Sequence, residues 1–225
     1  MPHRGAHVKI GIIGAGNIGG ALTRRLTALG HDVSVANSRG PETLADLAAE
    51  TGATPVPLTE AARGAEVVIV TIPQGKVPSL PKGLLDEAAE GVAVIDTGNY
   101  YPQRDGRIEE IENGVTESRW VANQLGHPVV KVFNGIQALH LRDKGVPAGT
   151  PGRIALPVAG DDPAAKATVL RLVEELGFHA HDAGSIDESW RQQPGSPSYG
   201  ADASPEKLPE LLAQASPDRT PEFTA

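Results

Sequence analysis

The sequence predicts an α/β protein built on a doubly wound, mostly parallel sheet. Three observations support this prediction. Short apolar runs of strand length alternate along the chain with segments whose apolar residues recur at helical spacing. A glycine-rich turn joins the first such strand to the first helix. One run, residues 66–72, is β-branched and apolar on both faces, as expected of a central strand in a parallel sheet.

The composition is that of an ordinary globular protein, and it argues against several classes of function. Of 225 residues, 40% are hydrophobic and 21% are charged. The net charge of −8 argues against nucleic-acid partners and anionic membrane surfaces. No apolar run approaches the roughly 20 residues of a membrane helix, and without cysteine there is no disulfide, thiolate nucleophile or cysteine metal site. Residues 1–7 run into the first strand without a signal peptide, so we expect a cytoplasmic protein.

The first strand, turn and helix carry the spacing G-x-G-x-x-G. Gly14, Gly16 and Gly19 follow the apolar run 8–13 and open an amphipathic segment over residues 18–29. In a Rossmann-like fold the first glycine permits the tight turn, the second admits a pyrophosphate, and the third lets the helix lie close to the strand. The start of the helix offers unpaired N–H groups and its positive dipole end to the phosphates. The predicted phosphate-binding residues are Gly14, Ala15, Gly16, Asn17 and Ile18.

The end of the second strand, residues 32–36, indicates which dinucleotide is bound. NAD-binding folds place an acidic residue here to bond the ribose 2′-hydroxyl. This chain has Asn37, Ser38 and Arg39 instead, with no carboxylate to repel a 2′-phosphate. Ser38 can donate a hydrogen bond to that phosphate and Arg39 can pair with it through a charge-assisted fork. We therefore predict NADP(H) rather than NAD(H), with a solvated loop arginine as the alternative for Arg39.

Two further strand ends are predicted to border the nicotinamide. The strands over residues 66–72 and 92–96 end at the carboxyl edge of the sheet, where open α/β sheets bind their ligands. The residues expected there are Thr71, Ile72, Pro73 and Asn99. Alternatively, Pro73 merely ends its strand.

The remaining elements follow the same alternation. We expect helices over residues 42–50, 59–63, 80–90, 104–114, 118–125 and 136–144, and strands over residues 54–56 and 129–133.

After residue 152 the pattern restarts as strand 153–159, helix 164–176 and strand 178–182, with a short helix through Trp190. We expect this strand–helix–strand unit to extend the same sheet. A proline-rich tail follows, with one helix over residues 206–215, wrapped on its own domain or on a neighbouring subunit. The predicted parts are an NADP(H)-binding domain (1–150), the extension (151–193) and the tail (194–225).

Several motifs in combination resemble the NADP oxidoreductases that depend on the deazaflavin coenzyme F420. They are residues 14–19 (GAGNIG), 37–41 (NSRGP), 71–73 (TIP), 131–134 (KVFN), 158–162 (VAGDD) and 182–185 (DAGS). The reductase domains of the STEAP ferric reductases are similar in the same places. The resemblance implies a Rossmann-like NADP(H) domain, a homodimer, and hydride transfer between the nicotinamide C4 and position 5 of a flavin or deazaflavin ring. The chain departs from the family at residues 190–195 (WRQQPG), where the family is apolar and helical.

No catalytic dyad stands out, and direct hydride transfer depends on proximity and orientation more than on an acid or base. His140 could donate to an acceptor carbonyl, although a surface histidine is the simpler interpretation. Asn134 could bond the nicotinamide carboxamide or the acceptor, and Trp190 could stack on a ring or simply pack. His179 and His181 share a strand face, but a third metal ligand is lacking, so no metal site is predicted.

The leading hypothesis is an NADP(H)-dependent oxidoreductase acting on a small-molecule redox acceptor. Deazaflavin F420 or a flavin is the first candidate acceptor, and a small carbonyl or imine is the variant. The alternative is a non-catalytic NADP(H)-binding protein that senses redox state through a partner. Steady-state oxidation of NADPH separates the two hypotheses.

Overall fold

The computed structural model describes residues 7–225. Residues 1–6, from which the absence of a signal peptide was expected, lie outside the described part of the chain. The main sheet has six parallel strands in the order β3-β2-β1-β4-β5-β6. They are β1 Lys9–Ile13, β2 Asp32–Ala36, β3 Thr54–Pro55, β4 Val67–Val70, β5 Ala93–Asp96 and β6 Val130–Lys131. This order, which reverses direction between β1 and β4, is that of a Rossmann-like doubly wound sheet and confirms the predicted fold class.

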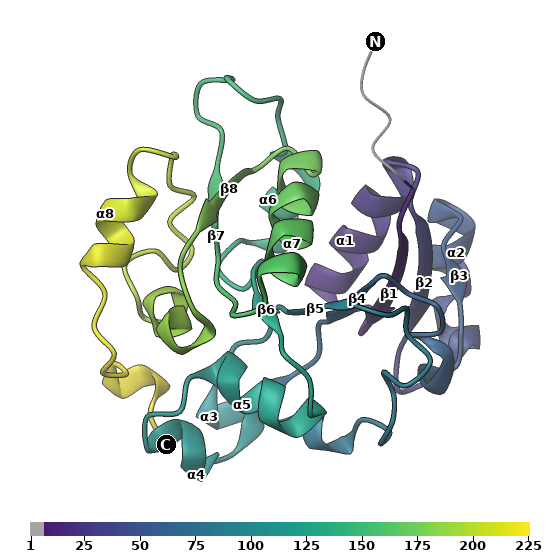
Figure 1. Ribbon diagram of the computed structural model, residues 1–225, viewed down its shortest axis with the longest axis horizontal. Helices are drawn as coiled ribbons and strands as arrows, with labels where there is room; N and C mark the ends of the chain where they lie inside the picture. Colours follow the sequence, from purple (N-terminus) through teal and green to yellow (C-terminus); the bar gives the residue numbers. More distant parts are fainter. Residues whose placement is uncertain (1–6) are drawn as a thin grey trace.

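Helices cover both faces of this sheet (Figure 1), and the central strand β4 is accordingly apolar and buried along its whole length. On one face lie α1 (Asn17–Ala28) and α7 (Pro163–Glu175), and on the other lies α5 (Glu117–Leu125). Leu22 and Leu26, one helical turn apart on α1, are fully buried against the sheet. The carboxyl ends of the strands are therefore the part of the sheet edge that a ligand can approach.

Shorter helices complete the two layers. They are α2 Ala45–Thr51, α3 Pro102–Asp105, α4 Glu109–Glu112, α6 Ala138–Asp143 and α8 Leu208–Ala213, with 3₁₀ segments η1 Pro41–Leu44, η2 Leu58–Glu60, η3 Gln74–Ser79, η4 Ile186–Gln192 and η5 Pro221–Phe223. Within residues 7–225, no helix has the length and apolar character needed to cross a bilayer.

One predicted helix, over residues 80–90, is wrong. The chain forms the 3₁₀ segment η3 and then a series of turns up to residue 92. Inside the expected helix, Gly83 adopts φ of +72°, which lies outside helical geometry and interrupts any helix that starts at Pro81.

The strand–helix–strand unit forms as predicted, but it does not extend the main sheet. β7 (Ala155–Val158) and β8 (His179–Asp182) pair in parallel as a separate two-stranded sheet. A single antiparallel bridge between Lys131 and Ala159 connects this sheet to β6. The outer edge of β7 is already occupied, because the tail residue Ala203 accepts a hydrogen bond from the Ala155 N–H at 2.8 Å.

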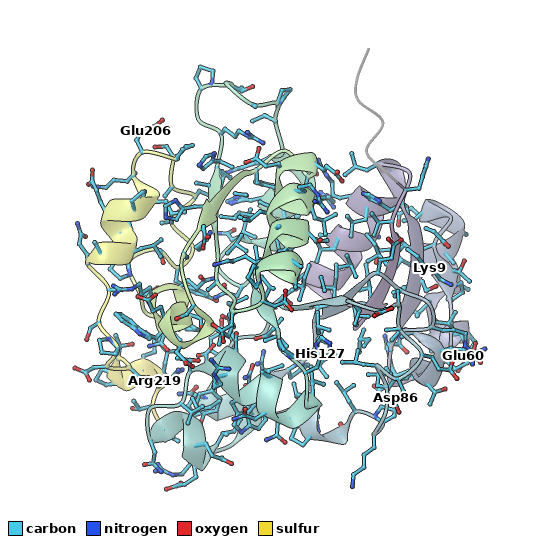
Figure 2. The ribbon with its side chains drawn as sticks, viewed as in Figure 1. Lys9, Glu60, Asp86, His127, Glu206 and Arg219 are labelled. Carbon is cyan, nitrogen blue, oxygen red and sulfur yellow. The ribbon has the colours of Figure 1, made fainter. Side chains whose placement is uncertain are left out.

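The proline-rich tail packs on its own chain. Leu208 and Leu212 of α8 are buried in a small cluster with Ala155. Farther along, the tail runs down the same side of the molecule as α8 (Figure 2), and Arg219 contacts Glu117 of α5. The tail therefore belongs to the folded body and forms part of its surface around the carboxyl edge of the sheet.

Candidate functional site

The three glycines of the G-x-G-x-x-G motif differ in whether the fold itself requires glycine at that position. Gly14 has φ of +106°, and a Cβ there would lie 2.3 Å from the carbonyl oxygen of Thr71. A Cβ on Gly19 would lie 1.9 Å from the carbonyl oxygen of Gly14. Gly16 has φ −72° and ψ −159°, which any residue adopts, and a Cβ there would meet nothing within 4 Å. The fold requires Gly14 and Gly19, whereas Gly16 leaves an open space in front of the helix.

The start of α1 is suited to hold an anion. Gly16 is the N-cap, no side chain caps the helix, and the first turn contains no acidic residue. Gly16 and Asn17 are both exposed. The uncapped N–H groups and the positive end of the helix dipole therefore face accessible space.

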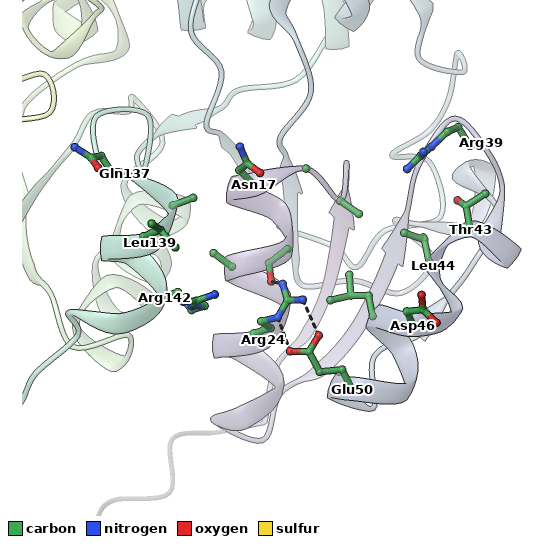
Figure 3. Close-up of a pocket in the computed structure, with 16 residues that line it drawn as sticks. Asn17, Arg24, Arg39, Thr43, Leu44, Asp46, Glu50, Gln137, Leu139 and Arg142 are labelled. Atoms are coloured by element: carbon green, nitrogen blue, oxygen red, sulfur yellow. Dashed lines mark hydrogen bonds and ion pairs between the residues drawn. The ribbon is translucent and has the colours of Figure 1, made fainter.

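This space opens into a cavity of about 780 Å³ (Figure 3). It is bordered by the glycine turn and α1, by the loop after β2 together with α2, and by α6. Asn17 stands at the top of α1, Arg39 and Thr43 lie on one wall, and Gln137 lies on the other. The structure thus brings three of the predicted phosphate-binding residues, Ala15, Gly16 and Asn17, into one cavity with Arg39.

Three arginines border this cavity, and Arg24 and Arg142 each form an ion pair with a carboxylate. Arg24 makes a two-pronged contact with Glu50, with both N–O distances at 2.6 Å, and this contact lowers the pKa of the Glu50 carboxyl. Arg142 pairs with Asp143 at 2.8 Å. Arg39 is exposed, and no carboxylate in the part of the chain that the structure describes forms an ion pair with it. Its guanidinium is therefore available to an anionic ligand in the cavity.

The loop that presents Arg39 is held by its neighbour Asn37. The side-chain oxygen of Asn37 accepts a hydrogen bond from the Arg39 N–H at 2.8 Å, and its amide donates to the Thr43 hydroxyl at 2.9 Å. Ser38, between them, is exposed. Asn37 therefore shapes the loop, while Ser38 and Arg39 present their polar groups outward.

The predicted nicotinamide end lies at the carboxyl ends of β4, β5 and β6. Thr71 and Ile72 are half-buried just beyond β4, and Pro73 is exposed. Asn99 and Asn134 meet across the ends of β5 and β6, because the Asn99 amide donates to the Asn134 carbonyl at 2.9 Å and the Asn134 amide donates to the Asn99 side chain at 3.1 Å.

The two catalytic candidates are both bound to later parts of the chain, Asn134 to η4 and His140 to the tail. The Asn134 side chain donates to the Gln192 carbonyl at 2.7 Å and accepts from the Gln192 amide at 3.0 Å, and Asn134 is 5% exposed. His140 on α6 lies 2.6 Å from a carboxylate oxygen of Asp202 and is not among the residues that line the cavity. In this structure Asn134 therefore holds the end of η4 in place, and His140 holds the tail.

The other two candidates lie in or near the second sheet. Trp190 in η4 packs under the guanidinium of Arg191, 4.3 Å from its ring centroid. His179 lies 3.7 Å from Glu174, and burial lowers the pKa of His181. Across residues 7–225, the structure gathers no group of three or more histidine, cysteine, aspartate or glutamate side chains that could hold a metal.

Sequence reasoning missed a cluster above β5. The hydroxyls of Tyr101 and Tyr199 hydrogen-bond to each other, and the Asn99 amide donates to Tyr199 at 3.5 Å. Arg104 lies 4.9 Å from the Tyr101 ring centroid and donates to the Asn99 carbonyl at 2.6 Å. The chain has only three tyrosines, and this scarcity is the one sequence signal that points to them.

A buried network of charges lies beneath this cluster. The Lys131 ammonium donates to the Gly98 carbonyl and lies 3.4 Å from Asp96 and 3.7 Å from Glu117. Arg219, from the tail, donates to Glu117 at 2.8 Å. The two cations and two carboxylates are each 8% exposed or less. The network fixes the loop that carries Asn99 and ties the tail to it.

Comparisons with known proteins relate the chain to NADP-dependent oxidoreductases. A family model described as NADP oxidoreductase, coenzyme F420-dependent, matches residues 9–100. The crystal structure of a hypothetical protein, SMa0349 of Sinorhizobium meliloti, is 30% identical, covers 86% of this chain and 93% of that one, and gives a TM-score of 0.72. A structure from Arthrobacter sp. FB24, described as an F420-dependent NADP reductase, is 24% identical over 92% of this chain and 90% of that one, with a TM-score of 0.65.

A curated relative matches a shorter stretch. YjhV of Escherichia coli strain K12 is 53% identical over 57 residues, which are 25% of this chain and 42% of that protein. The match therefore spans less than half the length of this relative.

Proposed function

The chain belongs to the family of coenzyme F420-dependent NADP oxidoreductases, and we propose that it transfers a hydride between NADP(H) and a second redox molecule. The observation that carries the proposal is the open space in front of Gly16, at the uncapped start of α1. The fold has no use for a missing side chain at this position, whereas a diphosphate that approaches the helix needs the space.

The preference for NADP(H) rests on the loop after β2. Arg39 has no ion-pair partner among the described residues and borders the same cavity as the glycine turn. A guanidinium in this position would pair with a 2′-phosphate, and Ser38 beside it offers a hydroxyl. The predicted cofactor residues Ile18, Thr71, Ile72, Pro73 and Asn99 would then border the rest of the dinucleotide.

The leading acceptor is deazaflavin F420, which the family description names, or a flavin, whose ring system is similar. A bound nicotinamide supplies the hydride at its C4 atom. The protein would bind both molecules and hold the nicotinamide against the acceptor at the ends of β4 and β5. A small carbonyl or imine is the second candidate, favoured by the hydroxyl groups of Tyr101 and Tyr199 near Asn99.

We also propose a homodimer located in the cytoplasm, without nucleic-acid or membrane partners. The family resemblance supports the dimer, and the net charge of −8 disfavours polyanionic surfaces. Light scattering during gel filtration tests the dimer directly.

The experiment for the activity is a screen of NADPH oxidation. The purified protein is mixed with NADPH and with F420, FMN, or a panel of small aldehydes and imines, and the absorbance of NADPH is followed. We expect acceptor-dependent oxidation of NADPH, with much slower oxidation of NADH. Tight binding of NADPH without turnover of any acceptor would instead support the redox-sensing alternative.

A further inference from the structure

The hydroxyl of the tail residue Tyr199 lies at the carboxyl edge of the sheet, where the acceptor is expected. Tyr199 lies 98 residues beyond Tyr101 in the chain, yet their hydroxyls are in hydrogen-bond contact. The Asn99 amide, which follows β5, donates to the Tyr199 oxygen at 3.5 Å and to the Asn134 carbonyl, which follows β6, at 2.9 Å. The phenol pair is therefore placed over the carboxyl ends of two adjacent strands.

The hydrogen bonds of this pair leave one proton unused. Each phenol carries one proton, and one of the two protons is used in the bond between Tyr101 and Tyr199. Asn99 donates its own amide proton to Tyr199, so this hydrogen bond uses neither phenolic proton. Among residues 7–225, no other acceptor is hydrogen-bonded to either hydroxyl, so one phenolic proton is available to a ligand.

The surroundings keep Tyr199 protonated at neutral pH. Its pKa is raised by burial, by the hydrogen bond and charge of Tyr101, and by the charge of Glu117, while Arg104 opposes this shift. Tyr199 is half-buried. A neutral phenol can donate a hydrogen bond, and the raised pKa means that Tyr199 gives up its proton only to a strongly basic atom, such as the oxygen or nitrogen that gains an electron pair in hydride transfer.

We infer that Tyr199 is a catalytic residue that donates a proton to the acceptor, an inference that rests on the proposed hydride-transfer function. The C4–H bond of NADPH breaks and its hydride forms a new bond to the acceptor carbon. The electron pair of the acceptor moves to the conjugated oxygen or nitrogen atom, which takes the proton of Tyr199. Tyr199 is reprotonated through Tyr101 from water. NADPH, one proton and the oxidised acceptor thus give NADP⁺ and the reduced acceptor.

This chemistry is shared by two kinds of acceptor. In a deazaflavin the proton goes to a ring nitrogen conjugated with the hydride-accepting carbon, and in a small carbonyl or imine it goes to the atom bonded to that carbon. Assays with F420 and with small aldehydes or imines distinguish these two sources, because only the true acceptor supports turnover.

The test compares Tyr199→Phe with Ser196→Ala, a matched control on the same segment of the tail. Ser196 contacts Ser198 at 3.3 Å and is not part of the phenol pair. We expect Tyr199→Phe to lower kcat by about 100-fold or more, with the Kd for NADPH and the melting temperature close to those of the wild type. The control should retain wild-type kcat.

The pH dependence separates proton donation from a merely structural role. The kcat of Tyr199→Phe should rise as the pH is lowered from about 8 to about 6, because hydronium then replaces the phenol, whereas the wild-type kcat changes little. Tyr101→Phe, which interrupts reprotonation but keeps Tyr199, should show a smaller loss. Wild-type turnover with an unchanged kcat in Tyr199→Phe would overturn the inference and leave the proposed function intact. If the wild type reduces no acceptor, both the proposed function and this inference fail.

Discussion

Replacing Gly16 or Gly19 by alanine should have different consequences, although the two glycines lie only three residues apart at the start of α1. At Gly19 a methyl group would lie 1.9 Å from the backbone oxygen of Gly14, so the helix must move away from the strand. At Gly16 a methyl group meets no protein atom within 4 Å, and the backbone there is already in a conformation that alanine adopts. Gly19→Ala should therefore disturb folding, whereas Gly16→Ala should disturb only a ligand.

The magnitudes follow from these contacts. Overpacking costs about 1–3 kcal/mol, and Gly19→Ala should reach the upper end because the obstacle is backbone; the melting temperature should fall by roughly 6–12 °C. In Gly16→Ala, the reduced entropy of the unfolded chain stabilises by about 0.4–1 kcal/mol, and the poorer N-cap costs about as much. The new methyl group displaces the diphosphate from at least two charge-assisted hydrogen bonds of about 1.5–3 kcal/mol each, which weakens NADPH binding about 100-fold or more.

Thermal unfolding without ligand and calorimetric titration with NADPH measure both effects on the same preparations. Gly16→Ala should melt like the wild type and fail to bind, while Gly19→Ala should melt at a lower temperature. If Gly16→Ala binds NADPH with the Kd of the wild type, the diphosphate does not lie in front of α1 and the proposed cofactor site is incorrect.

Three further predictions concern charged groups. Arg39→Ala should weaken NADPH binding by about 1.5–3 kcal/mol, roughly 10- to 100-fold, and leave the calorimetric Kd of NADH unchanged; equal losses for both nucleotides would contradict the 2′-phosphate contact. Arg219→Met leaves Glu117 buried without this partner, so the free energy of unfolding in urea should fall by about 3–5 kcal/mol; adding Glu117→Gln should recover much of it, and a lack of recovery would contradict the charge argument. Arg119 lowers the pKa of Asp187 through their hydrogen bond, so this contact stabilises the fold above the ordinary pKa of aspartate and is lost as the pH falls through the lowered value. The stability difference between wild type and Asp187→Asn should thus be at most about 1 kcal/mol at pH 7 and shrink as the pH falls below the ordinary pKa of aspartate, and a difference that does not shrink with falling pH would refute the linkage.

The parts of the fold that depend on local pattern could be predicted from the sequence. The bounds of β2 match the expected 32–36, because an alternating apolar run beside a glycine leaves little choice of conformation. The turn at residues 14–19 and the loop at Arg39 also follow from short-range rules on glycine, charge and strand order. The structure places Ala15, Gly16, Asn17 and Arg39 around one cavity for the same reason.

Features that depend on contacts between distant segments could not be predicted in this way. Nothing near Ala155 in the sequence indicates that its N–H would be bonded by Ala203 and that β7 would thereby be kept from joining the main sheet. The pairing of Tyr101 with Tyr199 is of the same kind. A proline-rich composition indicates an interrupted helix or a turn, but it carries no information about which surface the segment covers.

The contact between Arg219 and Glu117 also has a consequence for the order of events during biosynthesis. Arg219 lies 102 residues after Glu117 in the sequence. It is therefore synthesised after all six strands of the main sheet have been translated. Until then Glu117 has only Lys131 as a buried cationic neighbour, and Lys131 is shared with Asp96. The buried charge network under the loop that holds Asn99 is therefore completed only when the tail has emerged and Arg219 has docked on Glu117. Nucleotide capture by the newly made chain should accordingly lag behind the formation of its sheet.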